Sequence, residues 1–326
     1  MPLSLLPQTD SAWVAGPRQL QQGVNRRGLR RPWSARRKRD VLFAYGAILP
    51  AGLIFMVFIF VPVAMVVFIS LTEWDLVSPA YQFVGLRNYV ELATSGEFHK
   101  VLLNTLYFVG VQIPLDMALS LAIALMLNAK LRGTTFYRAL FFTPVVTPMV
   151  AVAAIWLWIY EPEVGLANYL LGKAGLGPLG WLDDPAWSMP AVILTSVWKG
   201  LGYDIVIFLA GLQNIPKEDY EAAAVDGADG FHAFRRITLP LLSPVTYFVL
   251  VMSVVNSFKV FTQVHVMTPD GGPLKATSVI VFYLYTQAFE RYRFGRASAV
   301  AVVLFGIVIL LTVFQRMVLE RRVHYQ

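Results

Sequence analysis

Apolar residues in this chain gather in long blocks that are separated by short polar stretches. A helix needs about 20 residues to cross the hydrocarbon core of a bilayer, and six of the blocks are long enough. The six segments lie near residues 41–71, 101–128, 136–160, 187–212, 244–266 and 297–318. The pattern therefore predicts an all-α membrane protein with six transmembrane helices.

Several of these segments contain proline, which removes a backbone donor and bends a helix. The residues are Pro50 and Pro62 in the first segment, Pro114 in the second, and Pro144 and Pro148 in the third. Kinked spans are tolerated in a bilayer because neighbouring groups can satisfy the freed carbonyls. We therefore expect bent helices rather than straight rods.

One further apolar segment, residues 277–290, is only about a dozen apolar residues long, which is short for a span. It is either a partial re-entrant helix or a seventh span that would reverse the C-terminus. The length favours the re-entrant interpretation.

Residues 1–40 form a basic tail with little apolar periodicity, and we expect this tail to be disordered. A secretory signal is disfavoured, because the next apolar segment is too long and lacks a small-residue cleavage site. The basic run at 26–39 places the N-terminus in the cytoplasm by the positive-inside rule.

Charges in the loops agree with that orientation, and six spans then place both termini inside. The predicted inner loops and C-terminus carry Lys130, Arg132, Arg138, Lys217, Arg235, Arg236, Arg321 and Arg322. The predicted outer loops carry Glu73, Asp75, Glu91, Glu97, Glu161, Glu163, Asp183 and Asp184. The exception is a basic group, Arg291, Arg293 and Arg296, which lies outside in this topology.

Composition narrows the classes of protein to which this chain can belong. The chain is 57% hydrophobic and 14% charged, which a water-soluble domain could not bury in one core. It has no cysteine and four scattered histidines, so we expect neither disulfides nor a metal site. The net charge of +7 suits anionic lipid headgroups better than nucleic acid, because it clusters before residue 40 and at segment ends.

The one long polar passage in the second half runs from Ile215 to Pro244. Pro216 suits a helix start, and the acidic first turn that follows complements the helix dipole. Three alanines extend the helix to Gly227, which can turn at positive φ. A second short helix is expected from Phe231 to Ile237. The passage therefore predicts a helix, a glycine turn and a helix between two spans.

These residues carry a resemblance to a known family. The spaced set is Glu221, Ala222, Ala223, Asp226, Gly227, Ala228, Phe234, Ile237, Leu239, Pro240 and Pro244. In order and spacing it resembles the EAA loop of permease subunits of binding-protein-dependent ABC importers. The resemblance implies the type I importer permease fold, with residues 215–243 as a cytoplasmic coupling loop and 41–326 as the transmembrane domain. An amphipathic helix resting on lipid headgroups is the alternative.

The resemblance also implies partners. These are a second homologous permease subunit, two ATPase subunits that bind ATP and Mg, and an extracytoplasmic solute-binding protein in a bacterial or archaeal inner membrane. Glu221 would anchor the coupling helix, Ala222 and Ala223 would allow close approach, and Gly227 would form its turn. This chain itself lacks a Walker lysine motif, a Gly-x-Ser-x-Gly elbow and a His-Glu-x-x-His motif. We therefore expect no enzymatic site in it.

Weaker similarities elsewhere point to the carbohydrate-uptake branch of the same family, typified by maltose and glycerol-phosphate permeases. They are Phe83-Val84-Gly85-Leu86, Asn88-Tyr89, Asn104-Thr105, Leu127-Asn128, Met267-Thr268, Gly271-Gly272-Pro273 and Thr277. The chain departs from the family after the phenylalanine of the fifth span, where Thr262 and Gln263 replace a usual acidic residue. That departure leaves the substrate open.

Polar side chains at membrane depth are costly and mark candidate pathway residues. They are Asn104, Gln112, Asp116, Lys199, Asp204, Asn256, Ser257, Lys259 and Gln263. Asn256, Lys259 and Gln263 recur at helical spacing and so predict one polar helix face, while Lys199 and Asp204 suggest a pair between helices. Sugar binding would use Asn104, Asp204, Asn256, Lys259 and Gln263, with Tyr203 stacking on the ring. The alternative is that these groups only join helices to one another.

We therefore predict the permease subunit of an ABC importer for a sugar, either an oligosaccharide or a related polyol or sugar phosphate. Two alternatives remain at this point. One is an ABC permease for a non-sugar solute, and the other is a secondary transporter whose inner loop is only structural.

Overall fold

The computed structural model describes residues 35–75, 78, 80–129 and 133–319. The helices and strands are α1 (Ala35–Phe55), η1 (Met56–Phe60), α2 (Val61–Ser70), β1 (Thr72–Glu73), β2 (Gln82–Phe83), α3 (Arg87–Thr94), α4 (Gly96–Asn128), α5 (Thr134–Val146), α6 (Met149–Ile159), α7 (Leu166–Lys173), α8 (Ser188–Gln213), α9 (Lys217–Val225), α10 (Gly230–Ala233), η2 (Phe234–Thr238), α11 (Leu239–Leu241), α12 (Ser243–Ser257), α13 (Thr262–Met267), η3 (Pro269–Gly271), η4 (Pro273–Lys275), α14 (Ile280–Tyr285), η5 (Thr286–Glu290) and α15 (Phe294–Leu319).

The chain divides into two units, Met1–Val57 and Phe58–Gln326. In the first unit α1 begins at Ala35, so the last residues of the predicted tail are helical rather than disordered. The predicted disorder of residues 1–34, the inner-loop charges Lys130 and Arg132, and the C-terminal pair Arg321 and Arg322 lie outside the described residues.

Four helical runs are long and apolar enough to cross a membrane, and there are up to six if each of two bent helix pairs is one span. The four runs are Val41–Ser70, Gly96–Asn128, Ser188–Gln213 and Phe294–Met317. They match the first, second, fourth and sixth predicted segments.

The third predicted span, 136–160, is not one helix. It is α5 followed by α6, and the two axes are bent by 103° at Thr147 and Pro148. The two prolines explain the bend, because Pro144 and Pro148 both lack the backbone N–H that continues a helix. The sequence predicted a kink here but not one of this size.

The second bent pair is Gly230–Leu241 with Ser243–Ser257, at 64°. The fifth predicted span, 244–266, is interrupted at a different place. Helix α12 ends at Ser257 and α13 begins at Thr262, so Phe258 to Phe261 break the helix. The prediction of one polar face through Asn256, Lys259 and Gln263 is therefore wrong, because the helical spacing does not continue across the break.

The segment 277–290 contains α14 and the π-helical turn η5, which together cover only Ile280 to Glu290. It is not among the described helices that are long enough to cross a membrane. Its side chains are well buried, with Val279 and Ile280 fully so. This agrees with a short helix packed inside the protein.

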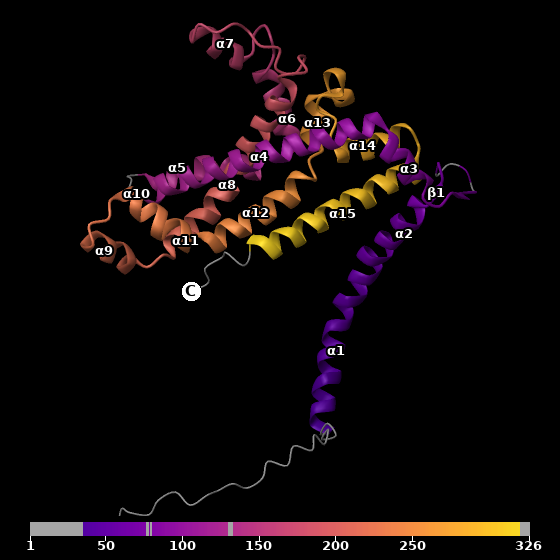
Figure 1. Cartoon of the computed structure of the whole chain (residues 1–326), viewed down its shortest axis with the longest axis horizontal. Helices are drawn as coiled ribbons and strands as arrows, with labels where there is room; N and C mark the ends of the chain where they lie inside the picture. The colour runs from indigo at the N-terminus through magenta and orange to yellow at the C-terminus, as the bar shows by residue number, and fades with distance from the viewer. Residues whose placement is uncertain (1–34, 76–77, 79, 130–132, 320–326) are drawn as a thin grey trace, which may run out of the picture. The chain divides into compact units, whose positions relative to one another are not determined.

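In the second unit α8 lies beside α4, α5 and α12 (Figure 1). Half of the most apolar stretch of α8 is buried. A glycine permits one of these contacts. A Cβ at Gly202 would lie 2.1 Å from the carbonyl oxygen of Phe141, so α8 and α5 meet with almost no space between their backbones. Phe208, Leu212 and Val249 form part of the apolar core between α8 and α12.

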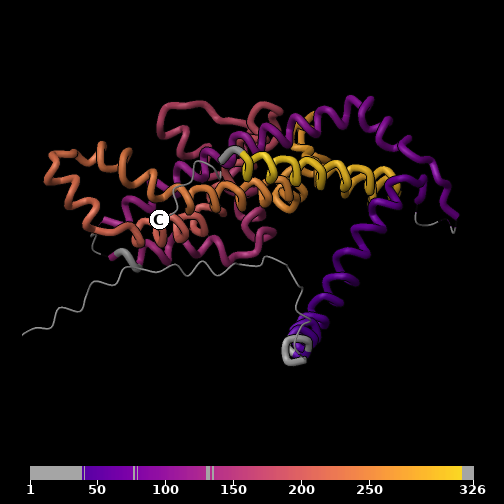
Figure 2. The backbone as a smooth tube through the Cα atoms, turned by 60° about the horizontal axis from the view of Figure 1, so that its bottom comes forward, coloured from indigo at the N-terminus to yellow at the C-terminus, as the bar shows by residue number. Residues whose placement is uncertain are grey.

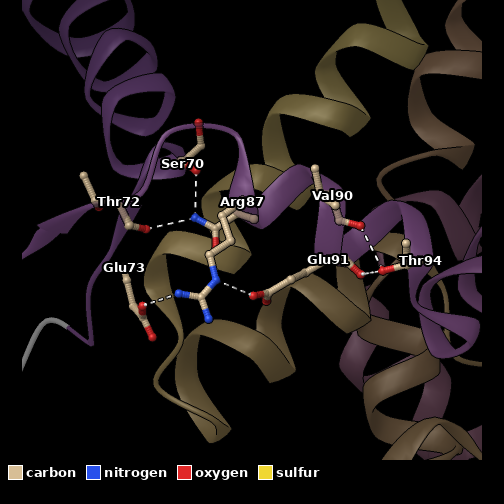
Figure 3. Close-up of polar contacts among 8 residues, drawn as sticks. Ser70, Thr72, Glu73, Arg87, Val90, Glu91 and Thr94 are labelled. Atoms are coloured by element: carbon tan, nitrogen blue, oxygen red, sulfur yellow. Dashed lines mark hydrogen bonds and ion pairs between the residues drawn. The ribbon is translucent and has the colours of Figure 1, made fainter.

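Strands β1 and β2 form a two-stranded antiparallel hairpin in which Thr72 pairs with Phe83. The side-chain amide of Asn88, on α3, donates to the carbonyl oxygens of Ser70 at 2.8 Å and Thr72 at 2.9 Å. Beside it Arg87 bonds to Glu91 at 3.0 Å and approaches Glu73 at 3.6 Å (Figure 3). This network joins α2, the hairpin and α3.

Two of the three arginines that violated the charge rule have partners. The guanidinium of Arg291 forms two hydrogen bonds to the carboxylate of Glu97, at 2.9 and 3.0 Å, and Arg296 donates to the hydroxyl of Tyr283. These contacts give two of the basic side chains partners within the protein.

Helices α9 and α10 lie at one end of the second unit, and α3 with the hairpin lies at the other (Figure 1). Helices α4, α8, α12 and α15 run between the two ends, and Figure 2 shows the same arrangement in a second view. The polar passage from Ile215 to Pro244 is therefore a terminal feature of the helix bundle.

Candidate functional site

The polar passage has the predicted helix, turn and helix. Helix α9 ends at Val225, and Gly227 adopts a φ of 78°, a region that only glycine enters without strain. The N–H of Ala228 donates to the carbonyl of Ala223 at 2.9 Å and closes the turn.

The next helix has a side-chain cap. Asp229 precedes α10, and its carboxylate accepts a hydrogen bond of 2.8 Å from the backbone N–H of His232. This bond, followed by one from the His232 side chain, lowers the pKa of Asp229. The hydroxyls of Tyr220 and Thr238, 2.9 Å apart, join the two helices of the loop.

The loop surface is open. Val225 is 89% exposed and Phe231 is 67% exposed, although both side chains are apolar. Of the predicted coupling residues, Glu221, Ala222, Asp226, Gly227 and Leu239 are exposed, and Ala223, Ala228 and Pro240 are half-buried. A concave region of about 470 Å³ lies beside Ala223, Gly227 and Ala228. Exposed apolar side chains on such a surface are typical of a protein interface.

The second candidate site is a cavity of about 260 Å³ between α4, α8, α12 and the α5–α6 bend. Its lining combines polar and apolar groups, namely Phe108, Gln112, Asp116, Val145, Met149, Ser196, Lys199, Gly200, Tyr203, Asp204, Ser253, Asn256, Ser257, Val260 and Gln263.

Hydrogen bonds orient several of these side chains. Gln112 donates to Asp116 at 3.1 Å and accepts from Ser257, so it links α4 to α12. Gln263 donates to Ser196 at 3.1 Å and links α13 to α8. Asp204 receives a 3.5 Å contact from the hydroxyl of Ser253, at the limit of a hydrogen bond. The cavity walls are therefore joined by side-chain bonds between helices.

Gly200 brings Asp116 close to α8. A Cβ at this position would lie 2.9 Å from an oxygen of that carboxylate. Asp116 and Asp204 are both buried at this cavity. The site can therefore offer carboxylate, amide and hydroxyl groups and the phenol ring of Tyr203 to a polar solute.

Of the six residues predicted to bind sugar, the structure brings together four, namely Tyr203, Asp204, Asn256 and Gln263. It places the other two elsewhere. Asn104 donates to the carbonyls of Lys275 and Ser278 at 2.8 and 3.0 Å, and Lys259 is exposed beyond the end of α12. Neither lines the cavity.

Sequence reasoning missed Ser196 and Ser253. A helical period could have found both. Ser196, Gly200, Tyr203 and Asp204 recur at spacings of three and four on α8, and Ser253 lies three and four residues before Asn256 and Ser257 on α12. The predicted partner of Lys199 also differs. Its ammonium donates to main-chain carbonyls of α5 instead of pairing with Asp204.

Among the described residues no group of three histidine, aspartate or glutamate side chains is arranged to hold a metal ion. The two sites together, a polar cavity within a helical membrane bundle and an open polar loop at its end, define a multi-pass membrane transport protein.

Comparison with known families makes the assignment specific. Residues 117–325 match the family described as binding-protein-dependent transport system inner membrane component, and the chain belongs to it. It is therefore a membrane permease component and not an enzyme.

Three curated relatives show how far the similarity extends. The chain is 37% identical over 281 residues to the probable ABC transporter permease protein YurN of Bacillus subtilis, covering 85% of this chain and 96% of the relative. It is 36% identical to the trehalose/maltose transport system permease protein MalF of Thermococcus litoralis, covering 84% and 92%. It is 34% identical to the sn-glycerol-3-phosphate transport system permease protein UgpA of Brucella abortus, covering 87% and 97%.

A solved structure has the same fold. One chain of a bacterial alginate ABC transporter, in complex with an alginate pentasaccharide-bound periplasmic protein, superimposes with a TM-score of 0.77 at 25% identity. The match covers 87% of this chain and 96% of that chain.

Proposed function

We propose that this chain is the transmembrane permease subunit of an ABC importer that translocates a sugar, either an oligosaccharide or a related polyol or sugar phosphate. An extracytoplasmic solute-binding protein delivers the solute, and separate ATPase subunits that bind ATP and Mg supply the energy. A second homologous permease subunit completes the pathway. The relatives support this proposal, because their names include a trehalose/maltose and an sn-glycerol-3-phosphate permease.

The turn at Gly227 is the observation that carries the coupling role. It exposes α9 and Phe231 at the end of the bundle, and a Cβ at Gly227 would meet nothing within 4 Å. Glycine at this position is therefore needed for the positive φ of the turn and not for close packing. We propose that residues 215–243 dock on the ATPase at the cytoplasmic face, with both chain termini on that side.

Helix α8 connects the loop to the cavity. It carries Ser196, Tyr203 and Asp204 at the cavity and continues without a break to Gln213, and α9 begins at Lys217. When the ATPase subunits close on nucleotide, movement of α9 would be passed along α8 to the cavity wall. This is rigid-body alternating access about a fixed site.

The cavity chemistry suits a hydroxylated solute. Amide, hydroxyl and carboxylate groups can exchange hydrogen bonds with sugar hydroxyls, and the ring of Tyr203 can stack on the apolar face of a sugar ring. We therefore propose Tyr203, Asp204, Asn256 and Gln263 as solute contacts, which retains four of the six predicted residues.

The test compares two glycines of the same loop in the assembled transporter, reconstituted with its partner subunits. Gly227→Ala, and more strongly the β-branched Gly227→Val, adds a Cβ at a φ of 78° and costs about 1–2 kcal/mol. Gly230→Ala is the matched control, because Gly230 also has nothing within 4 Å of its Cβ and its φ is not positive.

We expect the Gly227 variants to lose most ATP-dependent uptake of labelled maltose, trehalose or sn-glycerol 3-phosphate, and the Gly230 variant to keep it. Undiminished uptake with the Gly227→Val variant, with the ATPase assembled and active, would refute the coupling role. Uptake that follows an ion gradient and needs no ATPase would instead favour a secondary transporter.

A further inference from the structure

The break between α5 and α6 leaves two carbonyl groups without their helical donors. In a continuous helix the carbonyl of Pro144 would accept from residue 148, which is a proline and has no N–H. The carbonyl of Val145 would accept from Met149, but Met149 begins α6, which turns away by 103°. The end of α5 therefore needs donors from elsewhere.

Lys199 of α8 supplies them. Its ammonium nitrogen lies 2.6 Å from the carbonyl oxygen of Pro144 and 2.7 Å from that of Val145. Among the described residues, the only main-chain donor to either oxygen is the N–H of Thr147, 3.2 Å from the carbonyl oxygen of Pro144. A cation at this position also complements the negative end of the α5 dipole.

The Lys199 ammonium bonds to these carbonyls and not to a carboxylate. In the part of the chain that the structure describes, Lys199 forms no ion pair, although Asp116 and Asp204 line the same cavity. Close packing of α8 on α5 at Gly202 holds the lysine backbone beside the α5 terminus. The side chain therefore joins two helices that must keep their relative positions.

The capped break is itself part of the cavity. Val145 lies just before the bend and Met149 just after it, and both line the cavity wall. The angle between α5 and α6 therefore sets the distance between these two side chains. Lys199 fixes the position of the α5 end through its bonds to the last carbonyls of that helix.

We propose that Lys199 is a positioning residue for transport, which shapes the solute cavity by capping the broken end of α5. It acts through the backbone of Pro144 and Val145 rather than through the solute. The uptake readout below rests on the proposed function, whereas the labelling readout stands without it.

The experiment uses the absence of cysteine from this chain, so that a cysteine in place of Met149 is its only thiol. The assembled transporter carrying Met149→Cys is combined with Lys199→Met, which keeps the apolar stem and removes the donors, or with Lys199→Arg, which keeps charge and donors. Lys173→Met is the matched control, because this exposed lysine of α7 does not line the cavity and its ammonium lies over the ring of Tyr169.

With Lys199→Met we expect the rate of labelling by a water-soluble methanethiosulfonate to change at least fivefold. The maximal uptake rate of labelled maltose should fall at least tenfold, with less change in the apparent KM for the loaded binding protein. Lys199→Arg should stay within threefold of the parent in labelling and uptake, and Lys173→Met should match it.

Parent-like labelling and uptake in Lys199→Met would overturn the proposal. Equal defects in the Met and Arg variants would also overturn it, because the shape of the lysine stem would then matter and not its donors. If Lys199→Met does not assemble, Lys199→Gln replaces it as the uncharged variant and the comparison with Lys199→Arg decides. Altered labelling with no ATP-dependent uptake in the parent would reject the proposed function alone.

Discussion

The carboxylate of Asp229 accepts two hydrogen bonds from His232, each of 2.8 Å, one from the backbone N–H and one involving the ring nitrogen Nδ1. Both partners lie on the surface of the polar loop. The pair fixes the first turn of α10, directly after the Gly227 turn, and so gives the loop a defined shape without burial.

This pair predicts how the loop responds to acid. The bonds lower the pKa of Asp229 below its ordinary value of 3.8, so the ionised cap stabilises α10 at all pH above that value. The stabilisation is lost only as the pH falls through the lowered pKa of the folded state. Hydrogen exchange at the His232 amide, expressed as a ratio to the Asp229→Asn variant, should be constant from neutral to mildly acidic pH and change only in strong acid. A change of the ratio near pH 7 would contradict this.

Asn88 predicts a loss of stability at the other end of the bundle. Replacement by alanine leaves the carbonyls of Ser70 and Thr72 without this donor, at a cost of about 1–3 kcal/mol. Asn88→Asp removes the donor but keeps the shape, so both variants should lower the Tm of the detergent-solubilised protein. An aspartate variant as stable as the parent would show that the amide donor is not needed.

Gly295 predicts a steric effect at the start of α15. A Cβ there would lie 1.9 Å from the carbonyl oxygen of Thr72, and the clash is with backbone that cannot swing aside. Gly295→Ala should therefore destabilise the protein by about 1–3 kcal/mol or prevent expression. Gly306→Ala in the same helix has nothing within 4 Å and should leave the Tm unchanged or raise it. Equal Tm values for the two variants would refute the close approach.

Arg291 and Glu97 predict a modest pairwise coupling. The two hydrogen bonds between them have good geometry, but both side chains are more than a third exposed, at 38% and 37%. A double-mutant cycle with Arg291→Ala and Glu97→Ala should therefore give a coupling of about 0.2–1 kcal/mol that falls with added salt. A coupling of several kcal/mol that is insensitive to salt would indicate a buried pair.

Much of this protein can be predicted from local sequence. The apolar segments at 101–128, 187–212 and 297–318 became α4, α8 and α15, because length and hydrophobicity suffice to specify a membrane helix. The turn at Gly227 was equally local, since an alanine-rich helix followed by Asp-Gly-Ala leaves few backbone alternatives.

The cavity could be predicted only in part. Tyr203 and Asp204 follow the helical period of α8, which the sequence displays. Lys259 was wrongly placed at the cavity, because the prediction assumed a continuous helix that in fact ends at Ser257. Asn104 lies on a predicted helix, but its partners are the carbonyls of a loop more than 170 residues away.

The sequence by itself therefore determined four of the six apolar helices, the loop with its turn and the family, since each depends on residues close together along the chain. Only the tertiary structure decided the 103° break after α5, the position of Lys199 beneath it and the set of side chains that share the cavity. The physical reason is that an unpaired carbonyl at membrane depth takes whichever donor a neighbouring helix brings within reach, and sequence spacing does not specify which helix that is.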